Sequence, residues 1–477
     1  MSDLPESVVA VPSRGRLTRL WSELRLAARG TKHDYTTGSI GRAIFLLAVP
    51  MVLEMVMESV FAVVDIFWVA RLGPDAVATV GLTESLMAVV YTLAIGLAIG
   101  ATATVARRIG EKNPDAAARA AMQAIGLGVI VSATLGVIGG TLAPRLLGLM
   151  GASPDVIAKG TTFARVMLGG SASVFLLFVI NAVFRGAGDA AVAMRVLWLA
   201  NGINIVLGPL LIFGIGPFPK LGVTGAAIAT TIGRGTGVLV ALNRLAHDSG
   251  HLIVRRHHLR LDARAMLRLA RLSSSGTFQV LVGTSAWIGL IRILSGFGSV
   301  AVAGYTIAIR IVIFALLPAF GLSNAAATMV GQNLGAKNPE RAERAVWTAA
   351  RHNLVFLGVL GLVFVVLAGP IVAAFTTDPA VRAVGSLGLR TIAAGFPFYA
   401  FGMVLTQAFN GAGDTWTPTG INLAVFWLTE IPLAWVLSTR TSLGSTGVFV
   451  AITISYSVLA VVSALLFQRG RWKRRVV

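Results

Sequence analysis

The sequence predicts an all-α integral membrane protein with twelve transmembrane helices arranged as two pseudo-symmetric lobes of six. Three observations predict this class. The 477 residues are 56% hydrophobic and 13% charged, with a mean hydropathy of +0.80, which is too apolar for a soluble chain of this length. The apolar residues form unbroken runs instead of alternating with polar residues, so a transmembrane β-barrel is excluded. The third observation is an internal repeat.

The repeat brings residues 41–236 back 225 positions later. IGEKNP at 109–114 returns as LGAKNP at 334–339, and RGAGD at 185–189 returns as NGAGD at 410–414. Two motifs that keep one offset indicate a duplicated unit. In an apolar chain, such duplication is typical of transporters that bind their substrate between the repeats.

Twelve apolar runs are each long enough to cross a hydrocarbon core of about 30 Å. In chain order they run approximately over 43–69, 78–105, 121–143, 163–184, 196–215, 223–243, 272–296, 302–330, 347–369, 385–409, 418–438 and 447–467. They divide the chain into a basic N-terminal tail (1–40), a first lobe (41–243), a linker (244–271), a second lobe (272–468) and a basic C-terminal tail (469–477).

Three polar segments carry their own predictions. In the N-terminal tail, Leu17–Arg29 has leucines at helical spacing, which fits a helix on the membrane surface, with a disordered tail as the alternative. The linker ends in an amphipathic segment, LRLDARAMLRLARL, which we expect to form a separate interfacial helix. In the GAGD turns, Asp189 and Asp414 are expected to cap the helices that follow.

The net charge of +20 is explained by topology. If both termini are cytoplasmic, the tails and the loops on that side hold 29 of the 40 lysines and arginines, and the loops on the other side, with the adjoining span ends, hold about eight. This asymmetry follows the positive-inside rule and favours membrane lipids, not nucleic acid, as the partner of the basic segments. The chain has no cysteine, so disulfides and thiolate chemistry are excluded.

The first span carries three carboxylates, Glu54, Glu58 and Asp65, within about 40° of one helical face. A charged carboxylate at mid-bilayer costs about 2.5 to 3.5 kcal/mol, so this stripe should face a cavity and bind protons or cations. Polar packing contacts with neighbouring helices are the alternative. At the offset of 225, the second half has no acid at the matching positions, which hold Gln279, Gly283 and Leu290.

The pattern resembles the multidrug and toxic compound extrusion (MATE) transporters over residues 40 to 468. The resemblance rests on Pro50 with Glu54, VVDIFWVARLG at 63–73, GATATVARRIGEKNP at 100–114, the two GAGD turns, and LGVTGAAIAT at 221–230 echoed by LGSTGVFVAI at 443–452. It implies a monomeric antiporter of the bacterial inner membrane that works by alternating access. It also implies that Asp65, fifteen residues after Pro50, binds the coupling cation, and that Pro50 is a hinge.

The chain departs from this family at two places. The fifth span of the family often reads N-x-x-x-D-P, whereas this chain has Asn204 followed by Gly208 and Pro209, so we expect Asn204 to bind Asp65 or the ion. The branch typified by norfloxacin exporters carries a carboxylate where this chain has Gly283. This difference favours the proton-coupled, DinF-like branch.

The predicted activity is export of amphipathic organic cations in exchange for protons, with no cofactor and no metal site. A sodium-coupled exporter and a flippase for a lipid-linked substrate are the alternatives. No His, Ser and Asp recur at reactive spacing, so an enzyme is not expected. Glu430 is expected either to line the cavity or to pair with a neighbour such as Arg310. Candidate residues of the substrate cavity are Phe61, Trp68, Trp287, Tyr305, Gln279 and Glu430.

Overall fold

The computed structural model describes residues 16–247 and 250–475, and this part of the chain is helical with no β-strand. Residues 1–15 of the predicted N-terminal tail lie outside it. The elements are α1 (Arg16–Arg29), α2 (Ile40–Ala70), α3 (Pro74–Gly110), α4 (Pro114–Leu149), α5 (Pro154–Gly169), α6 (Ser171–Ala187), α7 (Ala190–Phe213), α8 (Val223–His247), η1 (Arg256–Leu259), α9 (Ala263–Ser295), α10 (Ser299–Gly335), α11 (Pro339–Ala373), α12 (Pro379–Ala394), α13 (Phe396–Gly411), α14 (Trp416–Asn422), η2 (Leu423–Glu430), α15 (Ile431–Thr439), α16 (Thr446–Gln468) and η3 (Arg471–Arg474).

The described residues contain 11 stretches that are long and apolar enough to cross a membrane, and 12 when α12 and α13 count as one span. These two helices meet at Gly395 with a bend of 57°, so the predicted span 385–409 is broken. The helices are also longer than predicted. The 37 residues of α3 extend about 55 Å, well beyond the hydrocarbon core, so the polar ends of the helix lie outside it.

The sequence repeat has a structural counterpart in the turns. Lys112 and Lys337, 225 positions apart, both have φ of 57°, which is rare for a side-chain-bearing residue. In each turn the next residue, Asn113 or Asn338, caps the following helix by accepting a hydrogen bond from a backbone N–H three residues on. The KNP motif is therefore a left-handed residue, an N-cap and a first-turn proline.

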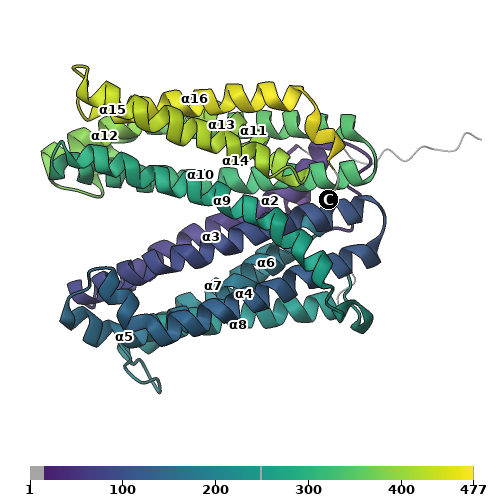
Figure 1. Ribbon diagram of the computed structural model, residues 1–477, viewed down its shortest axis with the longest axis horizontal. Helices are drawn as coiled ribbons and strands as arrows, with labels where there is room; N and C mark the ends of the chain where they lie inside the picture. The colour runs from purple at the N-terminus through teal and green to yellow at the C-terminus, as the bar shows by residue number, and fades with distance from the viewer. Residues whose placement is uncertain (1–15, 248–249, 476–477) are drawn as a thin grey trace, which may run out of the picture.

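The two lobes lie close together at the end of the bundle that carries the C-terminus and diverge towards the other end (Figure 1). Helices α3 to α8 form one lobe and α10 to α16 the other. Between them, α9 packs against α3 and α4 on one side and α14 on the other. The lobes meet along α2, α3 and α10. Here Gly321 is required, because a Cβ at this position would lie 2.7 Å from the Met51 carbonyl group.

One prediction about a polar segment is wrong. The amphipathic end of the linker is not a separate interfacial helix, because α9 begins at Ala263 and continues without a break into the seventh span. The described part of the basic C-terminal tail packs against the second lobe. Trp472 is fully buried and stacks on Phe467 with ring centroids 4.6 Å apart, and Arg475 pairs with Asp414 at 3.0 Å.

Candidate transport site between the lobes

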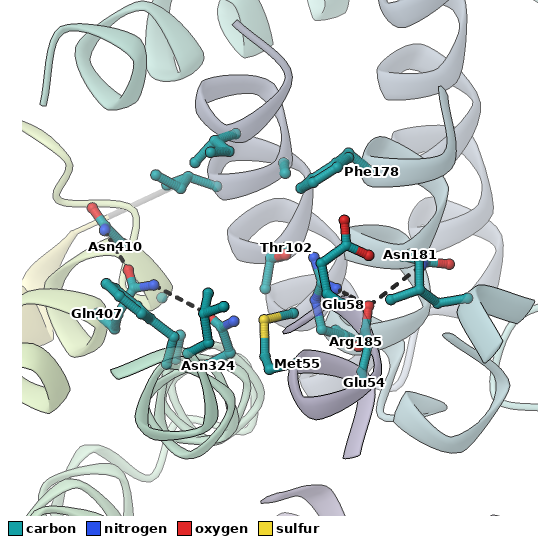
Figure 2. A pocket seen from close by; sticks show the side chains of 18 of the residues that line it. Glu54, Met55, Glu58, Thr102, Phe178, Asn181, Arg185, Asn324, Gln407 and Asn410 are labelled. Atoms are coloured by element: carbon teal, nitrogen blue, oxygen red, sulfur yellow. Dashed lines mark hydrogen bonds and ion pairs between the residues drawn. The ribbon is translucent and has the colours of Figure 1, made fainter. Parts of the chain in front are cut away.

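A cavity of about 350 Å³ lies between the lobes. Its walls come from α2, α3, α6 and α7 on one side and from α10 and α13 on the other. The lining is mostly apolar, with polar groups on both sides (Figure 2). The polar lining residues are Glu54, Glu58, Thr102, Asn181, Arg185, Asn324, Gln407 and Asn410. Two of the three predicted stripe carboxylates, Glu54 and Glu58, therefore face a cavity.

Glu54 is held by two side chains of α6. Its Oε1 lies 2.7 Å from Arg185 Nη1 and accepts a 3.3 Å hydrogen bond from Asn181 Nδ2. The Glu54 and Arg185 side chains are only 2% and 11% exposed. Because charges taken out of water need a partner, this pair fixes α2 against the end of α6.

Glu58 is held within the first lobe by α7 and α8. Its Oε1 lies 2.7 Å from Arg234 Nη2, and its Oε2 accepts a 3.0 Å hydrogen bond from Asn201 Nδ2. Arg234 is 1% exposed and its guanidinium lies 5.3 Å from the centre of the Phe61 ring. Phe61 thus makes a cation–π contact with the buried Arg234 side chain.

Asp65 lies further along α2 and makes no hydrogen bond within the described part of the chain. The charges that act on it most are those of Glu84 on α3 and Arg234 on α8. Asn204 does not bond it, since its Nδ2 donates a 2.7 Å hydrogen bond to Thr230 Oγ1 instead. Arg234 therefore pairs with Glu58, and its charge also acts on Asp65 and Glu84.

The second lobe contributes a chain of amides opposite these charges. Gln407 Nε2 donates to Asn324 Oδ1 at 2.9 Å, and Asn410 Nδ2 donates to Gln407 Oε1 at 2.6 Å (Figure 2). Asn410 is the repeat counterpart of Arg185, and both line the cavity. The sequence repeat therefore carried a signal for the cavity, in the residue that precedes each GAGD motif.

The six residues predicted for the substrate cavity do not line this one. Much of the wall of this cavity comes from α6 and α13, which carry none of these six residues. Trp68 packs on Phe213 with ring centroids 6.0 Å apart, Gln279 is 9% exposed, and Trp287 is 37% exposed.

Glu430 lies inside the second lobe and is 3% exposed. The charge of Glu430 acts on Tyr305, Tyr399 and Tyr456. The last two stack at 4.0 Å between ring centroids. The predicted pair with Arg310 is wrong, because Arg310 is exposed and the described residues hold no ion pair between them.

The segment 31–39 closes the end of the bundle that carries the C-terminus. Lys112 Nζ on one lobe lies 2.7 Å from Asp34 Oδ2. On the other lobe, Arg341 donates to the carbonyl groups of Thr37 and Gly38 at 2.6 and 2.8 Å. Bonds from Lys112 and Thr36 lower the pKa of Asp34 to about 2, although burial acts to raise it. This segment therefore holds both lobes by hydrogen bonds and charge.

Glycines close the same end by direct helix contact. A Cβ on Gly110 would lie 1.9 Å from the Gln332 carbonyl oxygen, and one on Gly335 would lie 2.2 Å from that of Arg107. Both glycines belong to the repeated motif at 109–114 and 334–339, so the motif brings α3 and α10 together. Pro50 lies inside the uninterrupted helix α2 and is buried. Its role as a hinge stays a prediction.

The two GAGD aspartates do not cap helices with their side chains. Asp189 stands before α7, but its carboxylate accepts a 2.8 Å hydrogen bond from the His251 N–H and lies 2.7 Å from His251 Nδ1. Asp414 accepts from the Thr417 hydroxyl at 2.7 Å and pairs with Arg475. Both turns are thus anchored to the linker or the tail.

Asp115, His257 and His258 place three potential metal ligands within 4.8 Å of one another. His258 Nδ1 accepts a 3.0 Å hydrogen bond from the Arg255 N–H, so its Nε2 carries the proton that points to Asp115 at 3.1 Å. A metal would need that nitrogen unprotonated. This geometry favours a hydrogen-bonded contact over a metal site.

Two lobes of membrane-spanning helices, with a cavity between them that carries charged and amide side chains, define a membrane transporter. The chain belongs to the MatE family, whose model matches residues 50–210 and 278–436.

The chain is 27% identical to a probable multidrug resistance protein NorM of Thermotoga maritima, over 92% of this chain and 94% of that protein. It is 28% identical to an FAD transporter of Shewanella oneidensis, over 92% and 96%. A crystal structure of MATE in complex with MaL6 superposes with a TM-score of 0.86 at 26% identity, over 92% and 97%. The chain is therefore a transporter and not an enzyme.

Proposed function

We propose that this transporter exports amphipathic organic cations in exchange for protons, by alternating access of the central cavity. Its similarity to proteins named for multidrug resistance supports drug-like substrates. The observation that carries the exchange is the buried ion pair of Glu58 with Arg234, whose charge also acts on Asp65 and Glu84. Negative charge in excess within a membrane is costly, so binding of a cation there stabilises the site.

A proton fits this site better than a sodium ion. Sodium requires several oxygen ligands around it, and the Arg234 guanidinium repels it electrostatically. Asn204, which could supply an oxygen, is hydrogen-bonded to Thr230 through its amide nitrogen. A proton needs only one carboxylate oxygen and so fits next to Arg234. The site thus favours proton coupling, with Asp65 as the carrier.

The cavity walls favour cations or neutral compounds over anions. Among the described residues lining the cavity, Arg185 is the one cationic side chain, and it is already paired with Glu54 at 2.7 Å. An anion such as the flavin dinucleotide named for the Shewanella relative would need an unpaired cation there. The same reasoning disfavours a lipid-linked phosphate as the substrate of this cavity.

The test is transport of a fluorescent organic cation into proteoliposomes under an imposed pH gradient. Asp65→Asn should reduce gradient-driven transport at least about tenfold while dye binding changes less than about threefold. The matched control is Asp75→Asn, since Asp75 is an exposed acid of α3 paired with Lys159 at 2.8 Å. Wild-type rates for Asp65→Asn would contradict the site. Transport driven only by a sodium gradient would contradict the coupling ion.

A further inference from the structure

A second cavity, of about 640 Å³, lies at the closed end of the bundle, apart from the transport site. Its walls come from α3 and α4 of the first lobe, from the linker and the first turns of α9, and from Gly413 of the second lobe. It therefore lies where the two lobes meet. Nothing in the proposed exchange mechanism uses it.

The lining of this cavity is strongly cationic. Arg108, Arg119, Arg260 and Arg268 line it, against one carboxylate, that of Asp262. That carboxylate is engaged, because it accepts a 2.8 Å hydrogen bond from the Arg264 N–H at the start of α9. Arg108 pairs with Glu111 at 2.7 Å. Within the described ranges, no carboxylate pairs with the other three arginines. Guanidinium groups arranged in this way suit a phosphate group.

The wall that carries Arg260 is fixed in place by Gln123 of α4. Gln123 is 5% exposed, and both ends of its amide bond the linker backbone. Its Nε2 donates to the Arg260 carbonyl oxygen at 2.9 Å, and its Oε1 accepts from the Asp262 N–H at 2.9 Å. Leu261 lies between them above Gly126, where a Cβ would approach it to 2.6 Å. The cavity is thus formed before a ligand binds, which reduces the entropic cost of binding.

Exposed leucines belong to the same segments as the arginines, and one of them, Leu261, lines the cavity. Leu259, Leu261 and Leu267 are 53%, 55% and 64% exposed, on the linker and the first turns of α9. A soluble phosphate would leave these leucines exposed to water. A phospholipid would bury them under its acyl chains, which is favourable. We propose that this cavity binds the phosphate of an anionic phospholipid, with the acyl chains against these leucines.

The proposal is tested by counting the lipids that the full chain retains. The detergent-purified protein is given equal amounts of dioleoylphosphatidylglycerol and dioleoylphosphatidylcholine, and bound lipid is measured by native mass spectrometry. We expect phosphatidylglycerol to be retained in preference. Arg119→Gln/Arg268→Gln should weaken that retention about tenfold. The control, Arg256→Gln/Arg264→Gln, removes the same charge from exposed residues of the same region that do not line the cavity.

Three outcomes would overturn the assignment. The first is retention of phosphatidylglycerol by the cavity variant at the wild-type level. The second is equal retention of phosphatidylcholine by the wild type. The third is displacement of the lipid by equimolar glycerol 3-phosphate, which would identify a soluble phosphate as the ligand. Unfolding temperatures in lipid-free detergent show whether the double variant is folded. If it is not, Arg119→Gln and Arg268→Gln are measured singly.

Discussion

Arg185 Nη1 lies 2.7 Å from Glu54 Oε1, and this ion pair stands at the wall of the central cavity with both side chains nearly buried. It joins α2, the helix of the predicted hinge, to the first GAGD turn, 131 residues further along the chain. Through the Arg185 carbonyl oxygen, which accepts a 3.1 Å hydrogen bond from Thr328 of α10, the same residue also contacts the second lobe. One arginine thus links the cavity, the helix of the predicted hinge and the lobe interface.

Removing one partner of this pair should destabilise the fold more than removing both. Arg185→Gln leaves the Glu54 carboxylate buried without a cation, at a cost of about 3 to 5 kcal/mol. Glu54→Gln/Arg185→Gln removes both charges and should recover most of that loss. Chemical unfolding of the purified protein in detergent measures the cycle. Additive losses would show that the pair contributes no coupling energy.

The glycine contact between α3 and α10 predicts a conformational variant. Gly110→Ala places a methyl group 1.9 Å from the Gln332 carbonyl oxygen, so the helices must separate and this end of the bundle should open. The measurement uses Ala327→Cys, a cavity position in this cysteine-free chain, and a membrane-impermeant maleimide supplied on the side of the C-terminus.

Labelling of that cysteine should rise several-fold in the Gly110→Ala background. The control is Gly81→Ala on the same helix, where a Cβ meets no atom within 4 Å. Equal labelling in both backgrounds would show that the glycine contact does not hold this end closed.

The contact between His251 and Asp189 predicts a dependence of stability on pH. Burial acts to lower the pKa of His251, but the bond to the Asp189 carboxylate outweighs it, so the pKa is raised above 6.5. A raised folded-state pKa means that the stabilisation is fully present below pH 6.5. It is lost as the pH rises through the raised value.

His251→Gln should therefore lower the unfolding temperature more at pH 6 than at pH 9. The His33 carbonyl, which contacts His251 Nε2 at 3.1 Å, is a neutral neighbour, and Lys32 opposes protonation electrostatically. Thermal unfolding of the wild type and the variant at both pH values measures the difference. An equal loss at both would show that His251 does not titrate in this range.

The fold and part of the site were predictable from local rules. Helical periodicity put Glu54 and Glu58 on one face, and both line the cavity. Their partners were not predictable, because Arg234 reaches Glu58 across 176 residues of sequence and such contacts depend on tertiary packing. The predicted aromatic residues do not line this cavity, since an apolar ring suits a lipid-facing surface, a core and a cavity equally well.

The distribution of basic residues predicts that both termini and the linker are cytoplasmic. Two exposed positions test this, Arg256 in η1 and Ser442 between α15 and α16. In intact cells, an impermeant thiol reagent should label Ser442→Cys and not Arg256→Cys. The reverse labelling pattern would invert the topology, and with it the direction of the proposed export.

Sharing of Arg234 predicts that Glu58 and Asp65 act as one unit. In Glu58→Gln, Arg234 loses its 2.7 Å ion pair and is left to neutralise Asp65, where it competes with the transported proton. We expect gradient-driven transport to fall about tenfold in Glu58→Gln. Once Asp65→Asn has removed the carrier, Glu58→Gln should lower transport little further, so the double variant should transport about as well as Asp65→Asn alone.

The double-mutant cycle is measured as dye transport under the same pH gradient, with dye binding as the control for an intact cavity. Fully additive losses would show that the two carboxylates work independently and that Arg234 does not connect them.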